Sequence, residues 1–183
     1  MMVAGPDLRF FYVSTTRPGS VNNVRVLRLS SLAERWNAGW RPFPNAVILG
    51  DSGYGLSSWL ITPLLCGEHN HAEHRFNCAH RRTRCVVECA FGVLKQRFAC
   101  LTKLRLTPTF AAQVIITCCI FHNISLSVHP LPDDEIQELL NEMADNVRLN
   151  EHGLEDEAEE ADDDEIEEVG MQRRRNQLIS SFI

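Results

Sequence analysis

TRCVVECAFGVLKQRFACL, residues 83–101, is the segment from which the architecture can first be read. Its apolar side chains recur three or four residues apart, which is the spacing of one helix face. They are Val86, Val87, Ala90, Phe91, Leu94 and Phe98. The pattern predicts an amphipathic helix that buries this face in a core and carries Glu88 on another.

Strands are expected upstream of this helix. AVILG at 46–50 is a short continuous apolar run, typical of a buried strand. Asp51 follows at the carboxyl end of that run, where open α/β sheets place their ligands. A second apolar run covers 59–65. Residues 8–15 are rich in aromatic and β-branched side chains and follow a turn signal, so they predict one strand of a hairpin.

Further helices surround these strands. Residues 21–36 show approximate helical spacing. Residues 110–128 are almost entirely apolar and follow Pro108, which predicts a buried helix. Residues 136–147 hold enough Leu, Ile and Met for a helix that docks on the body, whereas the polar, His-rich residues 66–80 predict a loop. Strands followed by helices indicate an α/β fold.

The charge is distributed unevenly over the 183 residues, although the net value is only −6. Residues 1–130 hold 14 Lys and Arg against 6 Asp and Glu, whereas residues 131–169 hold 1 against 18. Residues 170–183 hold 3 Arg and no acid. We therefore expect one basic domain at 1–130, a helix at 131–150, and an acidic, disordered tail at 151–183 that ends in a short basic segment.

Composition also limits the class of protein. Hydrophobic residues make up 44% and charged residues 23%, as in an ordinary soluble globular protein. We expect that the chain is not a membrane protein, because no apolar run approaches the roughly 20 residues that a membrane-spanning helix needs. The seven cysteines are an odd number, several lie in apolar stretches, and no secretory signal opens the chain. Reduced thiols in the cytosol or nucleus are therefore expected.

Asp51 and Glu88 are the first candidate site. If the strand end and the helix bring them together, the two carboxylates suit Mg²⁺ or Mn²⁺, which prefer oxygen ligands. Two such ions can clamp the attacking and leaving oxygens of a phosphodiester. The alternative is that Asp51 caps a turn and Glu88 is a solvated helix residue, and spacing alone favours this alternative.

A second candidate is a group of six metal-binding side chains at 66–80. They are Cys66, His69, His71, His74, Cys78 and His80. Cys and His at short separations can hold Zn²⁺, but the spacing matches no standard zinc template. The alternative is a His-rich surface loop.

Basic residues of the predicted helix form a third candidate. Arg81, Arg82 and Arg84 lie at its expected start, followed by Lys95 and Arg97. Cations at a helix amino terminus oppose the macrodipole, so their presence there indicates an anionic partner. That partner is nucleic acid, whose phosphates they would follow, or the chain's own acidic segment. The alternative is a solvated helix start.

Several segments resemble one known family. They are RPGSVNNVRVL (17–27), ILGDSGYGLSSWLITPL (48–64), FNCAHRRTRCVVECAFGVLKQRFACL (76–101), CCIFHNI (118–124) and RRRNQLISSF (173–182). In content and order they are similar to the DDE domain of Harbinger-type transposases and the nucleases derived from them. The resemblance covers nearly the whole chain from Leu8 onward.

The resemblance implies a fold and a chemistry. The fold would be RNase H-like, a mixed sheet flanked by helices, as in DDE transposases and integrases. The activity would be cleavage or transfer of DNA with Mg²⁺ or Mn²⁺, with Asp51 and Glu88 as metal-binding catalytic acids. It also implies a nuclear protein, with the cytoplasm as a second compartment, and a separate Myb/SANT-like protein that reads the DNA sequence.

The chain departs from the family pattern at two places. The first catalytic Asp of the family lies in an IDGTH-like strand that is absent here, so we expect a domain truncated at its amino terminus. Asn23 stands where the family has a further acid, and it offers a neutral oxygen. With less charge at the site we expect weak or lost activity. The alternative function is a non-catalytic transposase remnant that binds DNA or protein, in which the acidic block at 155–168 covers the basic residues as a DNA mimic.

Overall fold

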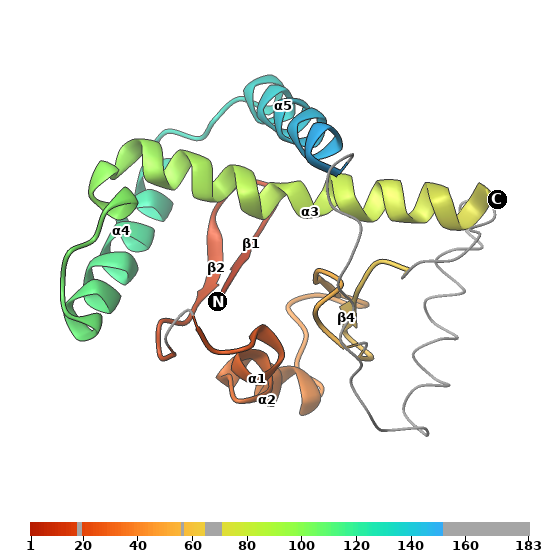
Figure 1. The fold of residues 1–183 in the computed structure, drawn as a ribbon, viewed down its shortest axis with the longest axis horizontal. Coiled ribbons are helices and arrows are strands. Elements are labelled where there is room, and N and C mark those ends of the chain that lie inside the picture. The colour runs from red at the N-terminus through yellow and green to blue at the C-terminus, as the bar shows by residue number, and fades with distance from the viewer. Residues whose placement is uncertain (18–19, 56, 65–70, 152–183) are drawn as a thin grey trace. The chain divides into compact units, whose positions relative to one another are not determined.

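The computed structural model describes residues 1–17, 20–55, 57–64 and 71–151 (Figure 1). They form two compact units, which are described separately. Unit 1 contains Met1–Glu34 and Cys85–Ala144, and unit 2 contains Arg35–Arg84 and residues 145–151. The predicted acidic tail lies outside the described residues, apart from Glu151.

Unit 1 begins with an antiparallel hairpin. Strand β1 (Met2–Ala4) pairs with β2 (Phe10–Val13), which confirms the strand predicted within 8–15. The connecting turn needs a glycine, because a Cβ on Gly5 would lie 2.1 Å from the Phe11 ring. Leu8 in the same turn adopts a left-handed φ of 62° and is fully buried. Burial of its side chain offsets the conformational cost of that backbone geometry.

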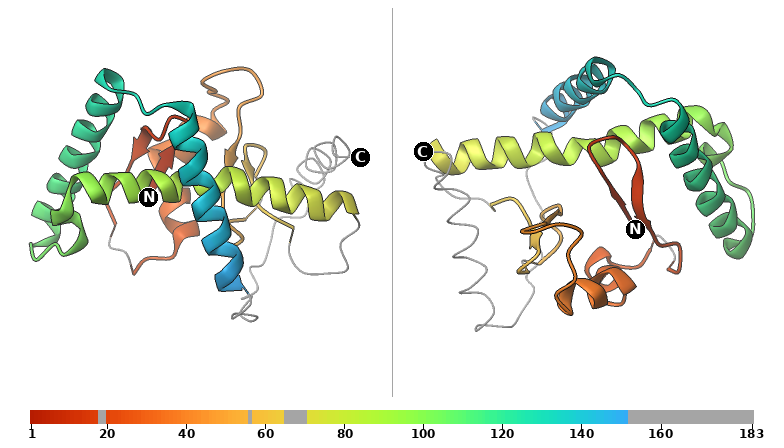
Figure 2. Two further views of the ribbon diagram at one scale, coloured as in Figure 1. Left: turned by 90° about the horizontal axis from the view of Figure 1, so that it is seen from above. Right: turned by 180° about the vertical axis from the view of Figure 1, so that it is seen from behind.

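Three helices complete the core of unit 1. They are α3 (His71–Arg97), which enters the unit at Cys85, α4 (Pro108–Val128) and α5 (Asp133–Glu151). The hairpin and α5 lie on opposite sides of α3 (Figures 1 and 2). The buried cluster consists of Leu8, Phe10, Cys89, Ala90, Val93, Leu94, Cys118, Cys119 and Leu126. The apolar face predicted within 83–101 is confirmed in part: Ala90 and Leu94 are buried, Val86, Phe91 and Phe98 pack against the cluster, and Val87 does not belong to it. The buried cysteines pack as small hydrophobic side chains.

Helix α4 differs from the expectation of a buried helix. Its existence is confirmed, but only Cys118, Cys119, His122 and Leu126 are buried. The exposed apolar side chains of α4 are Phe110, Ile116, Ile120, Phe121, Ile124 and Val128. An apolar sequence shows that a helix lacks charge but does not show how many sides are covered. Among the described residues, α4 alone is long and apolar enough to span a membrane, a property shared by core helices of soluble proteins. The expectation that no apolar run approaches that length is therefore wrong for α4.

Unit 2 holds a short parallel pair of strands. Strand β3 (Ile48–Leu49) pairs with β4 (Leu60–Ile61), which confirms that both apolar runs contain strands. Trp59 precedes β4, is buried and donates its indole N–H to Asn37. Its ring centroid lies 5.4 Å from that of Trp36, with the two rings tilted by 44°. The described residues thus combine one antiparallel and one parallel strand pair with helices, and this mixed architecture agrees with the predicted α/β class. The RNase H-like topology stays a prediction.

Two helix predictions were wrong in their limits. The segment 21–36 contains two helices, α1 (Asn23–Arg28) and α2 (Ser31–Asn37). Ser30 separates them, because its hydroxyl donates to the Leu27 carbonyl and accepts the Ala33 N–H. Residues 71–80 are the first turns of α3, where a loop was expected. These polar turns are stabilised by hydrogen bonds and by burial of one side of the helix. Both depend on tertiary contacts, so the local sequence does not predict them.

Candidate active site

Asp51 lies two residues after the end of β3, in unit 2, and is half-buried. Its Oδ1 accepts the Gly53 N–H at 2.7 Å, and its carbonyl accepts the Tyr54 N–H at 3.2 Å. The side chain of Asp51 therefore caps a turn, in agreement with the alternative prediction for this residue. A carboxylate has about four lone-pair sites, so one hydrogen bond fixes its orientation and leaves acceptor capacity for a cation. Burial, and then the charge of Asp51, raises the pKa of Tyr54.

The strand end that carries Asp51 is anchored to α3. Gly50 donates its N–H to the Ile61 carbonyl at 2.9 Å, which extends the β3–β4 pairing by one residue. His80 is buried and donates its Nε2–H to the same carbonyl at 3.1 Å. His80 therefore acts as a positioning residue for this strand end. The zinc hypothesis for 66–80 stays a prediction, because Cys66 and His69 lie outside the described residues. For His80, the structure shows that Nε2 is bonded to the Ile61 carbonyl.

Glu88 lies on the part of α3 that belongs to unit 1 and is half-buried. Its neighbours Cys85 and Cys89 are buried on the core side of the helix. Burial raises the pKa of the Cys89 thiol to about 11, with smaller contributions from Cys85 and then Glu88. The carboxylate of Glu88 is therefore close enough to the core edge for Cys89 to respond to its charge.

The predicted meeting of Asp51 and Glu88 stays a prediction, since the two residues belong to different units. Within the described residues, no group of three or more His, Cys, Asp or Glu side chains could hold a metal ion. The donor chemistry of two carboxylates fits Mg²⁺ or Mn²⁺, whose remaining positions water can fill. A site with two protein ligands would bind such an ion weakly.

Asn23 is the first residue of α1 and is exposed. Its neighbour Asn22 caps this helix, because its Oδ1 accepts the Val24 N–H at 2.8 Å. The structure thus gives Asn22 a local role in helix initiation, and the metal-facing role of Asn23 stays a prediction.

The basic residues lie along α3 in a different setting from the one expected. Arg81, Arg82 and Arg84 follow ten or more residues after the helix start at His71, so the macrodipole argument for an anionic partner was wrong. Lys95 and Arg97 lie in the last turn, where cations interact favourably with the helix dipole. Arg97 also donates to the His122 carbonyl at 3.4 Å. DNA binding by these five residues stays a prediction.

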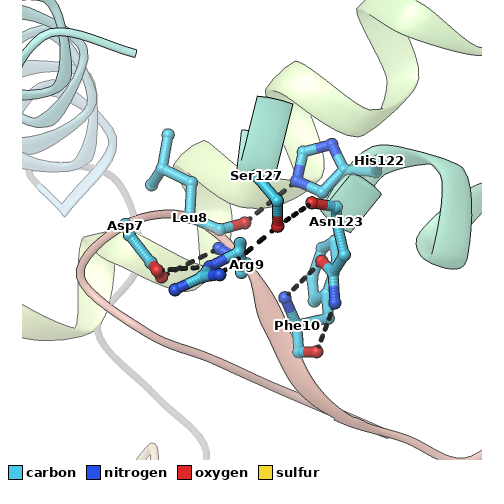
Figure 3. Close-up of polar contacts among 7 residues, drawn as sticks. All are labelled: Asp7, Leu8, Arg9, Phe10, His122, Asn123 and Ser127. Carbon is cyan, nitrogen blue, oxygen red and sulfur yellow. Dashed lines mark hydrogen bonds and ion pairs between the residues drawn. The ribbon is translucent and has the colours of Figure 1, made fainter. Parts of the chain in front are cut away.

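The motif CCIFHNI contributes a backbone clamp (Figure 3). Asn123 on α4 accepts the Phe10 N–H at 2.9 Å and donates to the Phe10 carbonyl at 2.8 Å. His122 is fully buried and donates its Nε2–H to the Leu8 carbonyl at 2.9 Å. The two side chains thus hold the hairpin on α4. From the sequence, this motif entered only the family resemblance, and the clamp was not predicted.

Unit 2 repeats this arrangement with α3. Asn77 accepts the Leu64 N–H at 2.8 Å and donates to the Leu64 carbonyl at 3.2 Å. Together with the bond from His80 to Ile61, this amide clamp holds the segment after β4 on the helix. The sequence marks this clamp by an Asn that lies three residues before a His in the polar segment that begins α3.

Comparison with known proteins places the chain in a family. The family model described as DDE superfamily endonuclease matches residues 1–123, which include Asp51 and Glu88. The chain belongs to this endonuclease family. The match confirms the resemblance to Harbinger transposase-derived nucleases, since relatives of that kind are among the similar proteins.

Three relatives show how far the similarity extends. A protein from Homo sapiens named "Putative nuclease HARBI1" is 41% identical over 118 residues, 62% of this chain and 33% of its own length. The Mus musculus protein of the same name is 36% identical over 155 residues, 74% of this chain and 44% of its own length. "Protein ALP1-like" from Arabidopsis thaliana is 29% identical over 177 residues, 90% of this chain and 43% of its own length. The chain therefore spans a third to less than half of these relatives, and no solved structure matches it.

Proposed function

We propose that this DDE endonuclease domain acts on DNA phosphodiesters with Mg²⁺ or Mn²⁺, and that Asp51 and Glu88 are its metal ligands. The family match across both acids supports this assignment most directly. Asp51 follows a strand and is held by a backbone N–H, so its carboxylate is oriented before a cation binds. The bound cation would supply Lewis-acid stabilisation of the phosphoryl oxygens.

The residues of the chain then have separate tasks. His80, through the Ile61 carbonyl, fixes the strand end that carries Asp51. Glu88 contributes the second carboxylate from α3. Arg81, Arg82, Arg84, Lys95 and Arg97 are proposed to contact DNA phosphates, a contribution that is independent of sequence and weakens with salt. Sequence-specific recognition would come from a separate Myb/SANT-like partner in the nucleus.

Activity is proposed to be low. Two carboxylates and the neutral Asn23 provide less negative charge than a two-ion site needs. The same shortage supports the second candidate, a non-catalytic remnant that binds DNA or protein in the nucleus. The two candidates differ in one measurable property, metal-dependent strand cleavage.

Nicking of supercoiled plasmid by the full chain in Mg²⁺ or Mn²⁺ tests the nuclease assignment. We expect slow, chelator-sensitive nicking that Asp51→Asn and Glu88→Gln each reduce by about a hundredfold or more. Glu34→Gln, an exposed acid on α2, is the matched control and should change nothing. Nicking that survives in both site variants would reject the assigned residues. DNA binding without nicking by the unaltered chain would favour the non-catalytic candidate.

A further inference from the structure

The first turns of α3 present a histidine and a cysteine to solvent. His74 and Cys78 are exposed and lie four residues apart, so they share one helix face. The Cys78 Sγ lies 3.8 Å from Nδ1 and 4.0 Å from Nε2 of His74. Both residues lie in unit 2. Their helical spacing keeps the thiol and the imidazole next to each other whatever the surrounding loops do.

These distances approach those of two ligands on one zinc ion. Zn–S bonds of about 2.3 Å and Zn–N bonds of about 2.0–2.1 Å at a tetrahedral angle place sulfur and nitrogen roughly 3.5 Å apart. The separation of the sulfur from Nδ1 exceeds this by a few tenths of an ångström, but the sulfur is nearly equidistant from both ring nitrogens and so lies off the lone-pair axis of each. Rotation of the exposed imidazole would turn one of these lone pairs towards an ion shared with the thiolate, and the helix backbone would not need to move.

We propose that His74 and Cys78 form a two-ligand site for a borderline or soft divalent cation of the zinc class. Thiolate and imidazole select such ions, whereas Mg²⁺ takes oxygen ligands. The site is thus chemically distinct from the carboxylate site of the proposed function. It goes beyond that function and does not depend on it.

The described residues supply two ligands to this site, because no group of three or more His, Cys, Asp or Glu side chains that could hold a metal ion is found among them. His80 on the same helix is excluded, because it is buried and bonds to the Ile61 carbonyl. With two ligands from the described residues, the site is expected to exchange its ion readily.

Titration of the reduced full chain with Co²⁺ alone tests the site, because cobalt bound to a thiolate gives a near-ultraviolet charge-transfer absorption. We expect this absorption to rise with Co²⁺ to the amplitude of one bound ion per chain and to disappear when Zn²⁺ is added. Cys78→Ser should abolish it, and His74→Asn should weaken Co²⁺ binding at least about tenfold. The two residues of the matched control set lie elsewhere: Cys100→Ser in the 3-10 turn Ala99–Thr102 and His129→Asn after α4, made singly and as a double variant.

The controls should bind Co²⁺ as the unaltered chain does. Circular dichroism should show unchanged helix content in every variant, because both proposed ligands are exposed. Absence of the absorption in the unaltered chain, or its persistence in Cys78→Ser, would overturn the proposal. Because the signal requires a thiolate, neither result depends on whether Asp51 and Glu88 bind Mg²⁺.

Discussion

The side-chain amide of Asn123 bonds both the N–H and the carbonyl of Phe10, as a neighbouring strand would. Removing the amide leaves two backbone groups of β2 without partners at a partly buried position. Asn123→Ala should therefore lower the free energy of unfolding by about 1–3 kcal/mol. Urea denaturation measures this change, with Gln137→Ala on the exposed side of α5 as a control expected to stay within about 0.5 kcal/mol. Equal effects of the two substitutions would contradict the role of the clamp.

His122 makes stability depend on pH. Burial lowers the pKa of His122; the bond to the Leu8 carbonyl opposes this shift, and the charge of Arg97 adds to it. Within the described residues, its Nδ1 has no hydrogen-bond partner. The folded state thus favours neutral His122, so its contribution is complete above the unfolded pKa of about 6.5 and declines as the pH falls towards the lower folded value.

His122→Gln separates this effect from the titration of carboxylates. The glutamine can still donate to the Leu8 carbonyl but does not titrate. We expect the unfolding free energy of the unaltered chain to fall more steeply below about pH 6.5 than that of the variant. Parallel pH profiles for the two proteins would show that His122 does not take up a proton on unfolding.

At the scale of elements, helix α4 has one face in the core and another in solvent. Leu126 is 4% exposed and Ile124 is 52% exposed, although they are two residues apart. Leu126→Ala should lower the free energy of unfolding by about 2–5 kcal/mol, because it opens a cavity in the core. Ile124→Ala should change it by about 0.5 kcal/mol or less. A large loss from Ile124→Ala would mean that this face is packed in the protein in solution.

Helix existence was predicted better than helix limits or burial. The periodic apolar side chains of α3 identify its buried face, because a single face decides that pattern. The break at Ser30 and the first turns of α3 depend on hydrogen bonds that sequence periodicity does not contain. The uncovered face of α4 escaped prediction for a similar reason, since a uniformly apolar helix has no periodicity that distinguishes its sides.

The candidate site was predictable only in part. Asp51 was found because it follows an apolar run, and the structure confirms its place after β3. Glu88 gained a role only from the family resemblance, because a single acid on a helix is ordinarily solvated. The positioning role of His80 was not predicted, since the bond to Ile61 joins residues 19 positions apart and leaves no local signal.

At the scale of the whole molecule, charge separates the body from the acidic segment. Residues 1–130 are net basic and residues 131–169 are strongly acidic. If the acidic segment competes with DNA for the basic residues, deleting residues 152–169 should tighten DNA binding at low salt. The gain should shrink as salt rises, because screening weakens exposed charges. Fluorescence anisotropy measures both, with a neutral Gly/Ser segment of equal length as the control, and unchanged affinity after deletion would exclude competition.

The proposed function requires that one hard cation binds to both Asp51 and Glu88. Fe²⁺ added in place of Mg²⁺, with ascorbate and peroxide, releases hydroxyl radicals that cut the backbone beside the bound ion. A Cys78→Ser chain removes the thiol site from this measurement. We predict cuts around residue 51 and around residue 88 in the same sample, both suppressed by excess Mg²⁺ and both lost in either Asp51→Asn or Glu88→Gln. Cutting around only one of the two residues, or cutting at 88 that survives Asp51→Asn, would contradict a shared ion.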